Sequence, residues 1–168
     1  MYLYADRFGT PTNAKKYTLA TWFKVAKNTN NNILNYNYGN GQRGFIIQIR
    51  SNDQTLRVND FTAGSTDHYD VRTNRVFRDY GAWYHLVVAY DSTQGTAADR
   101  VKVYVNGVQE TSFATASYPS QDLDSFIATT PQNNKGFNIG AYYNSSGNID
   151  AGNYFTGNFA QYIFADGT

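Results

Sequence analysis

The stretch that decides the fold is residues 83–107, which read WYHLVVAYDSTQGTAADRVKVYVNG. Residues 83–90 are apolar at almost every position, which is typical of a strand covered on both faces. Residues 100–105 alternate valine with longer polar side chains, which is the period of a half-buried strand. Asn106 and Gly107 favour a tight turn because both adopt positive φ at low cost. The polar connection between the two runs is too short for a helical crossover, so the stretch predicts an antiparallel pair.

The composition favours an all-β fold and excludes several classes of function. The 168 residues include 15 tyrosines and 11 phenylalanines but one methionine and one glutamate, so strand formers outnumber helix formers. Cysteine is absent, which rules out disulfides, thiolate metal sites and a cysteine nucleophile. The net charge of +1 and the lack of any Lys/Arg run argue against a nucleic-acid partner. No run of about 18 apolar residues occurs, so we expect no membrane insertion.

Short runs with strand character recur along the whole chain. Besides the two strands above, we expect a weak edge strand at 68–71 and strands at 17–25, 33–38, 45–50, 56–60, 108–113, 135–140 and 155–164. Residues 2–14 and 114–134 are expected to be irregular, and Trp22 and Trp83 are expected in the core. Some nine or ten short strands with regular turns predict one all-β domain, a two-sheet antiparallel sandwich with no long helix.

Several segments together carry a resemblance to a known family. They are YTLATWFK at 17–24, AWYHLV at 82–87, RVKVYVNGV at 100–108, ASYPSQ at 116–121, FNIG at 137–140, FTGNFA at 155–160 and FADG at 164–167. In this order they resemble the laminin-G-like, concanavalin A-like lectin/glucanase domains, in the version found in bacteriophage virion and tail-fibre proteins. The resemblance implies a jelly-roll sandwich with one concave sheet. It also implies one module of a longer, homo-oligomeric protein at the virion surface or another extracellular location.

Because the same fold houses glycosidases, catalysis is the first alternative to simple binding. Retaining glycosidases need two carboxylates about 5 Å apart. Here Glu110 is the one glutamate, and no carboxylate stands at Gln109 or Ser112. A Ser-His-Asp triad would need His68, which we expect in a solvated loop, or His85, which we expect to be structural within its strand. The sequence therefore predicts that the domain is not an enzyme.

Calcium is the one cofactor that the resemblance suggests, since many laminin-G-like domains hold one Ca²⁺ at the sandwich rim. Ca²⁺ prefers carboxylate, amide and carbonyl oxygens. No spacing here matches a dedicated calcium loop, so the sequence leaves open whether Ca²⁺ is bound. The candidate ligands are Asp60, Asp67 and Asp70 around the second hairpin, with Asp53 nearby, and Asp150, Asn148 and Asn153 near the C-terminus.

Two loops rich in tyrosine and asparagine carry the binding hypothesis. Sugars are held by stacking on aromatic faces and by hydrogen bonds to amides. We expect stacking from Tyr36, Tyr38, Tyr142 and Tyr143, and hydrogen bonds from Asn37, Asn40 and Asn144. The function this predicts is adhesion to host-surface carbohydrate. The alternatives are a virion decoration or assembly domain, whose tyrosines contact other virion subunits, and a secreted bacterial adhesion module.

Overall fold

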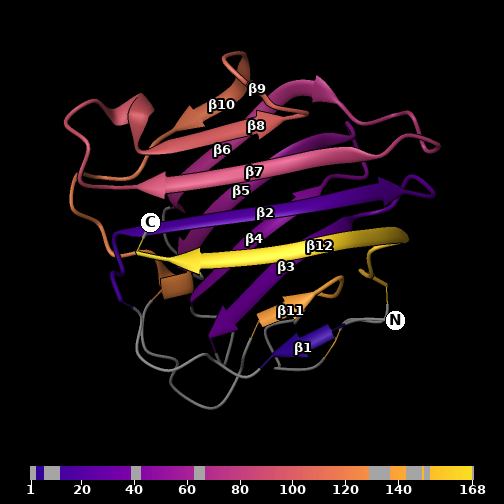
Figure 1. Cartoon of the computed structure of the whole chain (residues 1–168), viewed down its shortest axis with the longest axis horizontal. Coiled ribbons are helices and arrows are strands. Elements are labelled where there is room, and N and C mark those ends of the chain that lie inside the picture. The colour runs from indigo at the N-terminus through magenta and orange to yellow at the C-terminus, as the bar shows by residue number, and fades with distance from the viewer. Residues whose placement is uncertain are drawn as a thin grey trace.

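Two antiparallel sheets lie face to face in the computed structural model, and their strands cross obliquely (Figure 1). The structure describes residues 3–5, 12–38, 43–62, 67–128, 137–142, 149 and 152–167. The seven-stranded sheet has the order β1 (Leu3–Ala5), β11 (Phe137–Ile139), β3 (Asn31–Tyr38), β4 (Arg43–Ile49), β5 (Thr55–Thr62), β6 (Asp67–Val76) and β10 (Phe113–Ser117). The five-stranded sheet has the order β12 (Gly157–Asp166), β2 (Lys16–Val25), β7 (Tyr84–Asp91), β8 (Val101–Val105) and β9 (Val108–Gln109). The predicted all-β sandwich is confirmed.

The pair of strands predicted from residues 83–107 is present as β7 and β8, with Val88 opposite Val103. One detail of that prediction is wrong, because β7 is buried on one face and partly exposed on the other. Leu86 and Val88 are fully buried, whereas Val87 on the outer face is half-buried. The apolar residues of this run therefore lie on the outer face of the sheet as well as in the core.

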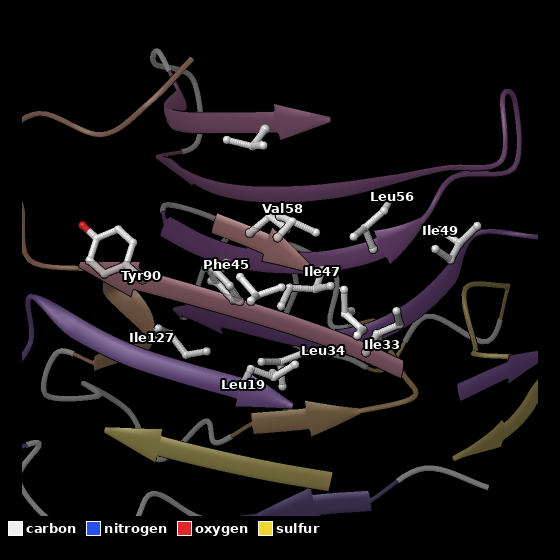
Figure 2. Packing of buried hydrophobic residues seen from close by; sticks show 14 of the residues in the cluster. Leu19, Ile33, Leu34, Phe45, Ile47, Ile49, Leu56, Val58, Tyr90 and Ile127 are labelled. Carbon is white, nitrogen blue, oxygen red and sulfur yellow. The ribbon is translucent and has the colours of Figure 1, made fainter. Parts of the chain in front are cut away.

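The core fills the space between the two sheets. Leu19 from the five-stranded sheet and Ile47 and Val58 from the seven-stranded sheet point toward one another and are fully buried (Figure 2). Tyrosines close one end of this core: the Tyr17 and Tyr90 rings stack at 5.0 Å, and the Tyr17 hydroxyl lies 3.0 Å from the Tyr69 hydroxyl. Burial raises the pKa of Tyr17 and of Tyr69 well above the ordinary value, so both stay neutral.

Three segments differ from the strands expected. The weak edge strand at 68–71 is part of the ten-residue β6, which lies between β5 and β10. Both regions expected to be irregular contain a strand, β1 in residues 2–14 and β10 in residues 114–134. The expected strand 108–113 is divided at Glu110, so that β9 joins one sheet and β10 joins the other. The carboxylate of Glu110 is buried and binds the Arg75 guanidinium at this crossing point.

The two tryptophans are not in the core, contrary to the sequence prediction. Trp22 is 37% exposed and Trp83 is 41% exposed. In β2 the buried positions alternate from Tyr17 to Val25 and include Thr21 and Phe23 on either side of Trp22, so strand alternation places Trp22 on the outer face. Apolar residues occupy both the inward-facing and the outward-facing positions of this strand, which is why periodicity alone did not identify its buried face.

Candidate functional site

A cleft of about 410 Å³ lies on the outer face of the seven-stranded sheet, on the side away from the core. Its floor comes from β3, β4 and β5, and its walls come from the strand ends and from the segments that carry Tyr142 and Asn153. The residues that line it are Asn30, Asn32, Ile46, Gln48, Arg57, Asn59, Phe61, Asp67, Tyr142 and Asn153.

Strand alternation explains why polar side chains gather on this floor. In β4 and β5 the core receives Ile47 and Val58, which pair across the two strands. The residues that alternate with Ile47 and Val58 along each strand face outward. Register places Gln48 opposite both Arg57 on β5 and Asn32 on β3. Two amides, from Asn32 and Gln48, and the Arg57 guanidinium therefore form one row across β3, β4 and β5.

Asparagines tie one wall of the cleft together. The Asn30 side-chain amide donates to Asn153 Oδ1 at 3.3 Å, and Asn32 Nδ2 donates to the Asn153 carbonyl oxygen at 2.8 Å. The Asn30 side-chain oxygen accepts a hydrogen bond from the Ser51 amide at 2.9 Å. Within the described part of the chain, the buried Oδ1 of Asn32 has no hydrogen-bond partner, which leaves an acceptor to be satisfied at the base of the cleft.

Arg57, the one cationic side chain among the described residues that line the cleft, is already neutralised by carboxylates. Arg57 Nε donates to Asp70 Oδ1 at 2.8 Å and Nη2 donates to Asp70 Oδ2 at 2.9 Å, while Asp67 Oδ2 lies 3.3 Å from Nη2. Burial opposes the charge of Arg57, but Asp70 first and then Asp67 outweigh that effect and raise its pKa. The three side chains together carry a formal charge of about −1, so the described lining of the cleft offers no unpaired cation to an anionic ligand.

Two aromatic rings line the cleft beside these polar groups. Phe61 on β5 pairs with Gly44 on β4, and its ring lies over the glycine so closely that a Cβ there would stand 2.5 Å from the ring Cζ. Tyr142 is half-buried and contributes the second ring. Flat rings beside amide donors and acceptors are the side-chain types that hold a sugar ring by its apolar face and its hydroxyls.

Among the residues predicted to bind sugar, Tyr142 lies in the cleft. The prediction for Tyr36 is wrong, because this side chain is 4% exposed and packs in the core with its ring centre 5.7 Å from that of Phe137. Asn37 and Tyr38 belong to β3, but their side chains lie outside the described residues. Asn40, Tyr143 and Asn144 lie outside them entirely.

The sequence analysis missed most of the cleft floor. Gln48, Arg57 and Asn59 each stand beside a buried apolar residue in a strand that the sequence did predict. Polar positions that alternate with valine and isoleucine were the available signal, but such positions normally face solvent without forming a site. Asn32 and Asn153, far apart in sequence, could be brought together only by the fold.

The three aspartates predicted to bind calcium do not form one site. Asp60 is 1% exposed, and its Oδ2 accepts hydrogen bonds from Ser125 Oγ and from the Phe126 amide, both at 3.0 Å. Asp67 and Asp70 instead bind Arg57 on the outer face. The described residues contain no group of three or more His, Asp or Glu side chains placed to hold a metal ion, so the prediction for this trio is wrong. Asp150 and Asn148 lie outside them.

The glutamate and histidines do not build a catalytic centre in the described part of the chain. Glu110 does not line the cleft and is bound to Arg75. His68 belongs to β6, not to a solvated loop, and its Nε2 lies 2.9 Å from Thr62 Oγ1. His85 packs against Trp22 with ring centres 4.8 Å apart. No described helix has the length and apolar character needed to span a membrane.

Comparison with known proteins identifies relatives of the fold. Residues 2–162 match the family described as the concanavalin A-like lectin/glucanases superfamily, and no curated protein sequence matches the chain. Similar solved structures include a Bacteroides ovatus protein with a proposed carbohydrate-binding role (TM-score 0.64, 20% identity, covering 99% of this chain and 42% of that one). The CBM40 domain of the Ruminococcus gnavus IT-sialidase has a TM-score of 0.62 at 14% identity, over 96% of this chain and 88% of that one.

A third similar structure is domain 4 of AbnA, a GH43 extracellular arabinanase from Geobacillus stearothermophilus (TM-score 0.59, 17% identity, 99% of this chain and 76% of that one). The chain thus spans less than half the length of the Bacteroides ovatus protein but most of the two individual domains. At these identities the similarity shows the fold, and the cleft residues carry any argument about function.

Proposed function

This chain belongs to the concanavalin A-like lectin/glucanase superfamily, and from that premise we propose that it is a non-catalytic carbohydrate-binding domain. The observation that carries the proposal is the cleft on the outer face of the seven-stranded sheet. There, two aromatic rings stand beside four asparagines and a glutamine over strands of fixed register. A saccharide offers both an apolar ring face and a set of hydroxyls, so it matches this combination.

The state of Arg57 indicates which saccharides fit. An acidic sugar is usually bound through a guanidinium that forms two parallel hydrogen bonds with its carboxylate. In this cleft Asp70 already occupies that bidentate position, and Asp67 lies on the same guanidinium. The cleft is therefore suited to neutral saccharides, whose hydroxyls hydrogen-bond to Gln48, Asn30 and the carboxylate oxygens.

Two of the similar structures support carbohydrate as the ligand class. The Ruminococcus gnavus CBM40 domain has been solved with α2,3- and α2,6-sialyllactose, and the AbnA domain has been solved with arabinotriose. Both sialyllactoses carry a carboxylate, whereas arabinotriose is neutral. The neutralised Arg57 supports a neutral ligand for the present chain.

For the biological setting we propose adhesion to host-surface glycan by a phage virion or tail-fibre protein. On this view the domain is one module of a longer homo-oligomer at the virion surface, and many weak sites act together through avidity. The resemblance of segments such as RVKVYVNGV at 100–108 supports this setting. A purely structural assembly domain would leave the cleft without a role, and a secreted bacterial adhesion module would use the same cleft in another organism.

A glycan array probed with the multimerised domain tests the proposal. We expect signal on neutral glycans, weak or no signal on acidic ones, and loss of signal in Tyr142→Ala. The matched control is Gln109→Ala, an exposed substitution on β9 of the other sheet. Repeating the array with calcium and with a chelator tests whether glycan binding depends on Ca²⁺. Signal confined to acidic glycans, or signal that survives Tyr142→Ala, would contradict the assignment of the cleft.

A further inference from the structure

The outer face of the five-stranded sheet carries both tryptophans of the chain and faces the viewer in Figure 1. Tryptophan is a largely buried residue type in folded proteins, so two that are each more than a third exposed on one face need an explanation. Register places Trp22 on β2 directly opposite His85 on β7. The next outward positions hold Lys24 and Trp83, with Lys24 Nζ 5.5 Å from the centre of the Trp83 ring. We call these four side chains the tryptophan platform.

The platform is built on a rigid support. It lies on β2, on β7 and on Trp83 directly before β7, and these two strands are flanked by further strands on both sides. Directly beneath it, Phe23 and Tyr84 pair across the same two strands and stack with ring centres 5.5 Å apart. Phe23 is fully buried and also contacts Phe77 and Phe155. The backbone that carries the indoles is consequently held in place before any ligand arrives, which lowers the entropic cost of binding.

The lysine of the platform differs from its neighbours in the fold. Lys15, Lys16 and Lys102 each bind an aspartate at 3.1–3.2 Å. Lys24 makes no ion pair within the described part of the chain and lies over an indole instead. Its ammonium is therefore available to a carboxylate, while the exposed indole surface suits the apolar face of a sugar ring.

We propose that the tryptophan platform is a second carbohydrate site, and that it binds acidic polysaccharide. A sugar ring stacks on Trp22 and its carboxylate pairs with Lys24. This site uses different residues from the cleft and has the opposite charge preference, because Arg57 of the cleft is neutralised whereas Lys24 is not.

Two other occupants fit the charges less well. Two-fold pairing of this face with a second copy would bring the Lys24 ammonium groups of both copies together, without a carboxylate in the platform to offset them. A single-stranded nucleic acid needs a basic track along its backbone, whereas the chain has a net charge of +1 and no basic run. Charge complementarity thus favours the acidic polysaccharide.

Tryptophan fluorescence is a direct test, because the chain's two tryptophans both lie in the platform and none lines the cleft. The probes are polygalacturonate, hyaluronate and polysialic acid, each beside its neutral methyl ester. We expect at least one carboxylated polymer to change the emission, and its ester to bind about fivefold more weakly. Lys24→Gln is expected to remove that difference, and Lys102→Gln, another outward lysine of this sheet, is expected to retain it.

The outcomes that would overturn the proposal are equally definite. One is unchanged emission with all three acidic polymers; another is equal affinity of the wild type for a polymer and its ester. Sedimentation tests the remaining alternative, since concentration-dependent association that disappears in Trp22→Ala would identify the face as an interface between copies. Circular dichroism of each variant establishes that it is folded. Gln48→Ala, which alters the cleft, is expected to leave the fluorescence response unchanged.

Discussion

Arg57 holds Asp70 by two parallel hydrogen bonds of 2.8 and 2.9 Å on the floor of the cleft. In the proposed function this pair favours neutral ligands, since the guanidinium is already engaged. Asp70→Asn removes one of the two carboxylates on Arg57 and frees part of its charge. We expect the ratio of acidic to neutral glycan signal on an array to rise about fivefold or more. Asp124→Asn makes the same change in net charge at an exposed position outside the cleft, and it is expected to leave the ratio unchanged. Equal ratios in both variants would contradict this role of Asp70.

Gly44 is required by the Phe61 ring that lies over it. A Cβ at this position would stand 2.5 Å from the ring Cζ, so Gly44→Ala must displace the ring from the wall of the cleft. We expect a loss of about 1–3 kcal/mol in the free energy of unfolding, measured with urea, and weaker glycan binding. In a Phe61→Ala background the same glycine substitution is expected to cost much less, because the clash is gone. An equal cost in both backgrounds would show that Phe61 is not the reason for the glycine.

The hydrogen bond between Tyr17 and Tyr69 stabilises the tyrosine end of the core. Each hydroxyl is the partner of the other at 3.0 Å, and both rings are fully buried. Tyr17→Phe or Tyr69→Phe alone leaves one buried hydroxyl without this partner, which is expected to cost about 1–2 kcal/mol of unfolding free energy. The double variant removes both polar groups and is expected to cost less than the sum of the two single variants. Strict additivity in the cycle would mean that the two hydroxyls do not interact.

Asp91 makes the stability of the domain depend on acid pH. Burial opposes ionisation of its carboxyl, but hydrogen bonds from Thr93, Gln94 and Lys16 outweigh that effect and lower its pKa to about 2. Because the folded state binds this proton less readily than the unfolded state, the contribution is complete above pH ~4 and is lost as the pH falls toward ~2.

The matching experiment compares urea unfolding of the wild type and Asp91→Asn from pH 6 to pH 2. The wild type is expected to be more stable above pH ~4 by about 1–2 kcal/mol, and the two curves are expected to converge at the acid end. Parallel curves over the whole range would show that Asp91 does not carry this dependence. Asp124→Asn is the control, because its carboxylate is exposed and makes no hydrogen bond within the described part of the chain.

The sequence predicted the sandwich because periodicity is a strong signal in strands such as β4, β5 and β8. It did not predict the strands formed by residues 3–5 and 113–117, which are short and depend on partners elsewhere in the chain. It also misplaced Trp22 and Tyr36. In β2, Trp22 and Phe23 stand at neighbouring positions, and only packing against the second sheet decides which of them is buried. Tyr36 stands between Asn35 and Asn37, a polar setting that favours an exposed position, yet the whole run 31–36 of β3 is buried.

The cleft was harder to predict than the fold. Tyr142 was identified because aromatic residues beside asparagine in a loop are typical of sugar sites. Gln48 and Arg57 form part of the floor only because register aligns them with Asn32, and a shift of one residue would turn them toward the core. The prediction of one calcium site from Asp60, Asp67 and Asp70 failed for a similar reason, since Asp60 and Asp70 face opposite sides of the same sheet.

The most direct test of the central claim is the affinity of the strongest neutral glycan from the array for wild type, Gln48→Ala and Gln109→Ala. Gln48 faces the cleft and makes no hydrogen bond within the described part of the chain, so its removal changes the ligand contact with little effect on folding. The account predicts that Gln48→Ala weakens binding by about fivefold, the equivalent of one hydrogen bond, and that Gln109→Ala leaves it unchanged. Equal affinities of all three proteins would contradict the placement of the carbohydrate site in this cleft.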